Sequence, residues 1–293
     1  MKKTPFIVKL LLWLVGTILV IALAISAVCI YVNKKYGINL FETYNQVKLL
    51  SKPVDEATFC DNKFTDADMA TAQTTVNASV AGLISYSETD GYKISTTGLG
   101  EDSMMSADLK ITDKQMGAIA KTIINSAEGG MTMNFNGETV QVDLFQIKFE
   151  NIDNVTGNAD VNIIVKMDIS SLQEKFNSFP LNMFKKYIPK TLYISSTTTI
   201  EKGEGNFAYT VKSKCLKINN LTKEQTSSLI KTLNLVAKIG TDEELNLMAG
   251  EPFANLLIGN STNTGFAYSL KDLGAKDYSF ETIGETNYFV IKK

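Results

Sequence analysis

Val161–Ile169 (VNIIVKMDI) is the stretch that decides the fold of this chain. Val161, Ile163, Val165 and Met167 recur at every second position. Side chains of a β-strand point alternately to its two faces, so this spacing places the four apolar side chains on one face. The stretch therefore predicts a strand with one apolar face that packs against a core.

The sequence on both sides of this stretch predicts further long strands. Upstream, Val140–Leu144 and Phe145–Phe149 alternate in opposite phases, which predicts a β-bulge near residue 144 or a strand that is covered on both faces. Downstream, Thr191–Glu201 and Phe207–Cys215 predict an antiparallel hairpin, with the odd-numbered residues of its second strand on one face. The last residues, 278–291, predict a closing hairpin.

Helices are predicted where a Thr is followed three residues later by Gln or Glu, because this pair can satisfy free backbone amides at a helix start. Three such pairs are Thr112 with Gln115, Thr222 with Gln225, and Thr241 with Glu244. Apolar residues follow each pair at helical spacing. Strands and helices together predict an α+β fold, in which a long, mostly antiparallel, twisted sheet packs on amphipathic helices.

The first two capping pairs belong to a longer internal echo. Residues 111–123 and 221–233 match at several positions with a constant offset of 110 residues. A duplicated strand-to-helix junction would explain the match, and so would capping chemistry that is common to many helix starts.

Leu10–Val32 holds 23 consecutive residues without a charge. As a helix it would be roughly 35 Å long, enough to cross the hydrocarbon core of a bilayer. Trp13 and Tyr31 lie near its two edges, where amphipathic rings are preferred. The run is longer than the apolar core of a cleaved signal peptide. A lipoprotein cleavage before Cys29 is disfavoured because Val28 is not small, so we predict an uncleaved transmembrane helix.

This helix divides the chain into a short cytoplasmic tail, a membrane span, a juxtamembrane stalk and an extracytoplasmic domain. The predicted boundaries are 1–9, 10–32, 33–59 and 60–293. Within the stalk, Leu40–Ser51 predicts an amphipathic helix that either lies on the bilayer or packs on the domain, and we favour packing. A short lysine-bearing tail before a large domain predicts a single-pass protein of the cell membrane with its N-terminus in the cytoplasm.

The composition excludes several kinds of chemistry. All 29 basic residues are lysine, and histidine is absent. The chain therefore cannot form a Ser-His-Asp triad, a Cys-His dyad or a histidine-ligated zinc site. Residues 1–52 carry a net charge of +6 and the remainder −8. An acidic outer domain disfavours nucleic-acid binding. We predict no catalytic residue, no metal site and no cofactor.

Two patterns in the chain resemble catalytic motifs. Ser228–Lys231 fits the S-x-x-K pattern of penicillin-binding enzymes, but the accompanying S-D-N and K-T-G elements are absent. The adjacent acids Glu101-Asp102 and Glu243-Glu244 could serve a carboxylate-dependent hydrolase, although such pairs are usually solvated. Both patterns favour structural roles over catalysis.

Two further features are predicted: a groove that binds an apolar ligand, and a pair of cysteines that could form a disulfide. An apolar groove would be lined by Val161, Ile163, Val165, Met167, Phe207, Tyr209 and Val211. Cys60 and Cys215 share the predicted outer domain, where they either form a disulfide in an oxidising compartment or stay free and buried.

Five stretches carry a family resemblance: Lys34–Phe41 (KKYGINLF), Asn62–Met69 (NKFTDADM), Pro189–Thr197 (PKTLYISST), Ile218–Thr226 (INNLTKEQT) and Gly265–Thr282 (GFAYSLKDLGAKDYSFET). Through them the chain resembles uncharacterised single-pass membrane proteins of low-GC Gram-positive bacteria over most of its length. This resemblance implies the cell envelope and no activity. At the level of fold the chain also resembles tubular lipid-binding domains, in which a twisted sheet wraps a helix around an apolar groove.

We therefore expect a membrane-anchored, non-catalytic envelope protein that binds an apolar or lipid ligand, or a partner protein, near the membrane surface. One alternative is an accessory or scaffold subunit without a small ligand. The other is a carboxylate-dependent hydrolase.

Overall fold

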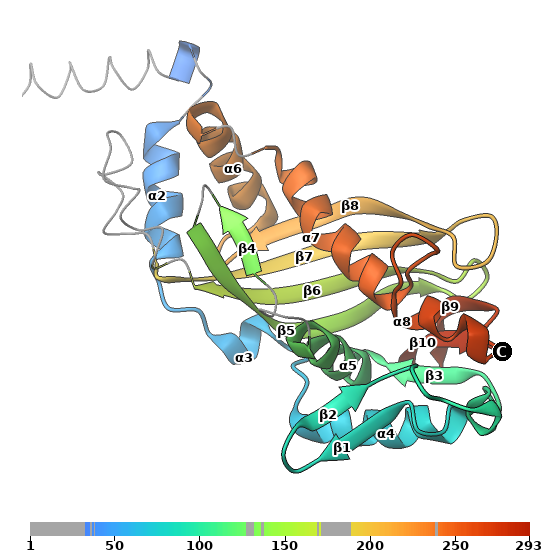
Figure 1. The fold of residues 1–293 in the computed structure, drawn as a ribbon. Coiled ribbons are helices and arrows are strands. Elements are labelled where there is room, and N and C mark those ends of the chain that lie inside the picture. Colours follow the sequence, from blue (N-terminus) through green and yellow to red (C-terminus); the bar gives the residue numbers. More distant parts are fainter. Residues whose placement is uncertain are drawn as a thin grey trace, which may run out of the picture.

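The computed structural model describes residues 33–35, 37, 39–126, 132–135, 138–168, 170, 189–237 and 240–293. Strands of the described part form antiparallel sheets, and helices pack on them, so the predicted α+β class is confirmed (Figure 1). The predicted span Leu10–Val32 lies outside the described residues. Within the described ranges, no helix has the length and apolar character needed to cross a membrane.

The largest sheet has five strands in sequence order, all antiparallel. They are β4 (Thr132–Phe135), β5 (Glu138–Asp153), β6 (Asn158–Asp168), β7 (Thr191–Lys202) and β8 (Tyr209–Ile218). A register shift between Leu144 and Gln146 leaves Phe145 outside the ladder, which confirms the predicted bulge. A second register shift leaves Lys214 of β8 unpaired between Ser213 and Cys215.

A three-stranded sheet lies at the β5–β6 turn. It contains β3 (Leu109–Thr112), β10 (Thr286–Lys292) and β9 (Asp277–Ile283) in that order, and the last two form the predicted closing hairpin. The Asn154 side chain joins it to the large sheet, since it donates to the carbonyl of Thr282 at 3.0 Å and accepts from the same residue's N–H at 2.7 Å. A separate small hairpin is formed by β1 (Ile84–Ser87) and β2 (Gly91–Ile94).

Helices cover one face of the large sheet (Figure 1). They are α7 (Asp242–Leu257) on β7 and β8, α6 (Lys223–Ala237) at β8, and α5 (Asp113–Ser126) on β5, with α4 (Asp66–Ser79) packed on α5. Shorter helices are α3 (Glu56–Phe59) and α8 (Phe266–Ser269). The three predicted capping boxes are confirmed, because in each the Thr accepts from the backbone N–H of the third residue on, whose side chain accepts from the Thr backbone.

The main core lies between the helices and this face of the sheet. It includes an aromatic cluster in which the ring of Phe280 lies 5.2 Å from that of Phe149 and 5.3 Å from that of Phe289, measured between centroids. Edge-to-face and tilted arrangements at such distances are favourable for aromatic rings.

Both repeats of the 110-residue echo are helix starts that follow a strand, β3 before α5 and β8 before α6.

Helix α2 (Leu40–Leu50) packs on α6. Val47 and Leu50 of α2 form a small apolar cluster with Leu221 and Leu229, separate from the main core. Of the two arrangements expected for this helix, the structure has the packed one. The stalk is thereby joined to the folded domain.

Candidate binding cleft on the polar face of the sheet

The two faces of the large sheet differ in character. Val161, Ile163 and Val165 are buried on the helix-covered face, and the register pairs them with Thr198, Ser196 and Ile194 of β7. The residues between them point to the opposite face. The polar members of that face are Gln146, Lys148, Glu150, Asp160, Asn162, Ser195, Thr197 and Thr199. We call it the polar face.

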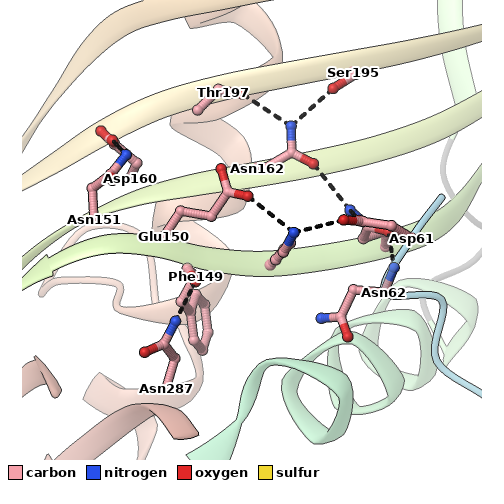
Figure 2. A network of polar contacts seen from close by, with 12 residues as sticks. Asp61, Asn62, Phe149, Glu150, Asn151, Asp160, Asn162, Ser195, Thr197 and Asn287 are labelled. Carbon is pink, nitrogen blue, oxygen red and sulfur yellow. Dashed lines mark hydrogen bonds and ion pairs between the residues drawn. The ribbon is translucent and has the colours of Figure 1, made fainter. Parts of the chain in front are cut away.

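Residues 52–64, which we call the strap, cross one part of the polar face and are hydrogen-bonded to it. Gln146 is only 1% exposed. Its Oε1 accepts from the backbone N–H of Asn62 at 2.8 Å, and its Nε2 donates to Asp61 Oδ1 at 3.2 Å and to Asn162 Oδ1 at 3.1 Å (Figure 2). The amide of Asn162 in turn donates to Ser195 and Thr197. Because these partners come from β5, β6 and β7, the network fixes the strap on the sheet.

An ion pair adds to this attachment. Lys148 Nζ lies 2.7 Å from Asp61 Oδ2 and 3.1 Å from Glu150 Oε1 (Figure 2). The hydrogen bond from Lys148 lowers the pKa of Asp61, and the same bond raises the pKa of Lys148. Both groups therefore stay charged at neutral pH.

Asp160 is the most deeply buried carboxylate of the polar face, at 3% exposure. It accepts from Thr199 Oγ1 and from Asn151 Nδ2, each at 2.6 Å, and it pairs with Lys214 Nζ. Burial acts to raise the pKa of Asp160, but the hydrogen bonds from Lys214, Thr199 and Asn151 outweigh burial and lower it. The carboxylate is held ionised as a structural acceptor.

This pattern extends to the other carboxyl groups. Among the described residues, every carboxyl group with a resolved change has a lowered pKa, including Glu56, Asp61, Asp160 and Glu281. A general acid that works at neutral pH needs a raised pKa. The described carboxylates are therefore suited to accept hydrogen bonds and ion pairs.

An open cleft of about 620 Å³ lies where the strap meets the end of β8 and the start of α6. Its lining residues are Asp55, Thr58, Phe59, Cys215, Lys217, Asn219, Asn220, Leu221, Thr222, Lys223 and Glu224. The volume falls within the range of ligand pockets. Phe59 and Leu221 supply apolar surface, and the rest of the lining is polar or carries a thiol.

Buried hydrogen bonds hold the wall of the cleft in place. Asn219 has a positive φ of 47°, which Asn tolerates better than most residues. Its Oδ1 accepts from the N–H of Tyr193 at 2.7 Å, and its Nδ2 donates to the carbonyl of Leu50 at 3.2 Å. The β8–α6 turn is thus attached to both β7 and α2, and the cleft exists before any ligand enters it.

Lys217 is the cation in this lining whose ammonium donates no hydrogen bond to a described residue. Its side chain is exposed. After the hydrogen bonds from the Glu224 backbone and from Thr222, the charge of Lys217 helps to lower the pKa of Glu224, which lines the same cleft. Lys223 is different, because its Nζ donates to the carbonyl of Lys214 at 2.8 Å. An ammonium group in this position can bind a carboxylate.

The residues predicted to line an apolar groove lie elsewhere. Val161, Ile163, Val165 and Phe207 are buried in the main core, and the other three, Met167, Tyr209 and Val211, pack against it. Helix α7 covers this region of the sheet, and its Gly250 approaches Thr198 closely. The seven side chains therefore contact the protein's own core, and none of them lines the cleft.

The prediction that Cys215 shares a face with the other odd-numbered residues of its strand is wrong. The bulge at Lys214 pairs Ser213 with Thr198 but Cys215 with Thr197, so the two odd-numbered residues point to opposite faces. Cys215 thereby enters the cleft.

Cys60 and Cys215 are both free thiols. Cys60 is buried, and burial raises its pKa to about 11, which keeps the thiol protonated at neutral pH. Its chain neighbours Thr58 and Phe59 line the cleft together with Cys215. A disulfide between the two cysteines in an oxidising compartment stays a prediction.

No family model, curated protein or solved structure matches this chain. The described part contains no group of three or more Cys, Asp or Glu side chains that could hold a metal ion. Sequence reasoning missed the cleft because its two walls, residues 55–59 and 215–224, are far apart in the chain. The Asn219-Asn220 turn was the one local signal, and it has no ligand-specific pattern.

Proposed function

We propose that this protein is a membrane-anchored, non-catalytic protein of the cell envelope, whose outer domain binds a segment of a partner protein in the cleft. The supporting observation is the open cleft with the exposed ammonium of Lys217 in its lining. Amide and hydroxyl groups beside an apolar patch suit a polypeptide, which presents both backbone polar groups and side chains. An acidic side chain of the partner would meet Lys217.

The packing of the sheet favours a protein partner over a lipid. A lipid ligand would need a continuous apolar surface, and the apolar side chains of β6 are already covered by the protein's own core. The cleft offers hydrogen-bonding groups and charges beside its apolar surface, a mixture that suits a polypeptide. The proposed partner therefore binds on the side of the sheet that the helices leave open.

The anchor is part of the same proposal. Leu10–Val32 would hold the protein in the cell membrane, with the N-terminus in the cytoplasm and the domain outside. Resistance of the protein to carbonate extraction, and protease access to the domain from the outer side only, would support this topology. Release by carbonate would contradict it.

The cleft offers a native residue for crosslinking. In the full chain, Cys29→Ala and Cys60→Ala leave Cys215 as the sole cysteine, which can carry a maleimide-linked benzophenone. The matched control moves this cysteine to Val155→Cys, a position 94% exposed in the β5–β6 turn, in a chain that also carries Cys215→Ala. Irradiation in native membranes should give a discrete protein adduct from Cys215 and none from the control. The same pattern from both positions, or lipid adducts alone, would refute the proposal.

Lys217→Glu tests the cation directly. Charge reversal should reduce the yield of this adduct by about fivefold, because an exposed ion pair contributes up to ~1 kcal/mol. Lys110→Glu is the matched control, since Lys110 is also an exposed strand lysine but lies on β3. An equal loss in both variants would show a general charge effect and would contradict a role for the cleft.

A further inference from the structure

The orientation of α2 is fixed by its contacts with the domain. Val47 and Leu50 are buried against α6, and Gln46 is 1% exposed. Glu42 Oε1 accepts from Ser228 Oγ of α6 at 3.2 Å and from Gln46 Nε2 at 3.0 Å. Because apolar and polar contacts hold the same face, α2 cannot roll without losing them. The opposite face of α2 is therefore held outward.

This outward face carries aromatic side chains. Phe41 is 63% exposed and Tyr44 is 40% exposed. They are three residues apart on the helix, so they lie on one face. Phe41, which the fixed helix holds largely in solvent, is a candidate contact with a membrane or a protein.

The position of Phe41 in the chain selects the membrane. It lies nine residues beyond Val32, the end of the proposed span. Even a fully extended chain would keep Phe41 within roughly 30 Å of the bilayer edge. The helical residues 33–35 shorten this reach. Aromatic side chains are favoured in the headgroup region, where the ring meets apolar surroundings and a hydroxyl can stay solvated.

The helix pair lies at one end of the large sheet. Leu50 of α2 is near the start of α6, whereas Glu42 meets Ser228 further along it, so the two helices are antiparallel. Figure 1 shows them side by side, away from the β9–β10 hairpin. The β5–β6 turn contacts that hairpin at the other end of the sheet.

We propose that Phe41 inserts into the headgroup region of the bilayer and sets the position of the outer domain on the membrane. This inference rests on the proposed anchor. It commits to a phospholipid interface as the occupant of the outward face of α2. Because the α2–α6 contacts attach α2 to the domain, the domain is then held at a fixed place relative to the membrane.

Tryptophan fluorescence in proteoliposomes tests the inference with the full chain. Trp13 is the only tryptophan, so Trp13→Phe gives a silent background. In that background, Phe41→Trp should lose about half of its fluorescence in phospholipids brominated high on the acyl chain, relative to unbrominated lipid. The matched control Val155→Trp, at the other end of the sheet, should be unaffected.

Each other outcome has a distinct meaning. If Phe41→Trp is unquenched while the protein resists carbonate extraction, the inference fails and the anchor stands. A blue-shifted but unquenched emission would show that protein, such as a second copy of the chain, covers the face, which also overturns the inference. Release of the protein by carbonate would overturn the anchor and the inference together. The crosslink from Cys215 is independent of all three results.

Discussion

Replacing Asp160 by Asn should destabilise the domain by about 3 kcal/mol. The carboxylate is buried and accepts from Thr199, Asn151 and Lys214. An Asn side chain keeps the shape but turns one acceptor into a donor, which then faces another donor. Hydrogen bonds to a charged group contribute about 1.5–3 kcal/mol, and breaking a buried ion pair costs about 3–5 kcal/mol. Lys214 is half-exposed and can turn to solvent, so we expect the lower part of that range.

Urea denaturation of the full chain in detergent, followed by circular dichroism at pH 7, measures this loss. Asp143→Asn is the matched control. Asp143 pairs with Lys121 at 2.9 Å, but both side chains are exposed, so its loss should stay below about 0.5 kcal/mol. A loss below about 1 kcal/mol for Asp160→Asn would refute the reasoning.

The difference in unfolding free energy between wild type and Asp160→Asn should depend on pH, and the pKa of Asp160 fixes the sign of this dependence. The folded state lowers the pKa of Asp160 below its ordinary value of 3.8. Its carboxylate therefore stabilises the native state fully at pH values above the ordinary pKa, and this contribution is lost as the pH falls through the folded pKa. The free energy of unfolding should differ most between wild type and Asp160→Asn at pH 7, and this difference should shrink below about pH 4. An equal difference at pH 7 and pH 3 would contradict the assignment.

Three further predictions concern packing and the thiols. Gly250→Ala should cost about 2 kcal/mol in urea denaturation, because the new Cβ would lie 2.4 Å from Thr198 Cγ2, and an unchanged midpoint would contradict this close packing. Thr198→Val should stabilise the protein by about 0.5–1 kcal/mol in the same assay, since it removes a buried hydroxyl without a partner, and a loss of stability would show that the hydroxyl is satisfied. If Cys60 and Cys215 pair, a non-reducing gel of oxidised protein should show a faster band that is absent from Cys60→Ser, whereas equal mobility with and without reductant would rule out the pair.

Local patterns in the sequence determined the secondary structure well. The capping pairs predicted where α5, α6 and α7 begin, because the reciprocal hydrogen bonds involve only residues three apart. The phase change near Leu144 predicted a bulge or a strand covered on both faces, and the structure has the bulge, because side-chain direction follows directly from strand periodicity. Such signals depend on short-range geometry, which a single sequence contains.

Long-range packing decided the rest. Periodicity showed that Val161, Ile163 and Val165 share a face, but not that the protein's own core would cover these three side chains. The bulge at Lys214 reversed the direction of Cys215, which no alternation pattern revealed.

By itself, then, the sequence determined the α+β class, the helix starts, the main strands and the absence of histidine and arginine chemistry. Only the tertiary structure decided which face of the sheet stays open, and it placed Lys217 and Cys215 beside the strap in one cleft. The physical reason is that each of these features depends on contacts between segments that are far apart in the chain, such as α7 on β7 or the strap beside β8, whose energies no local pattern specifies.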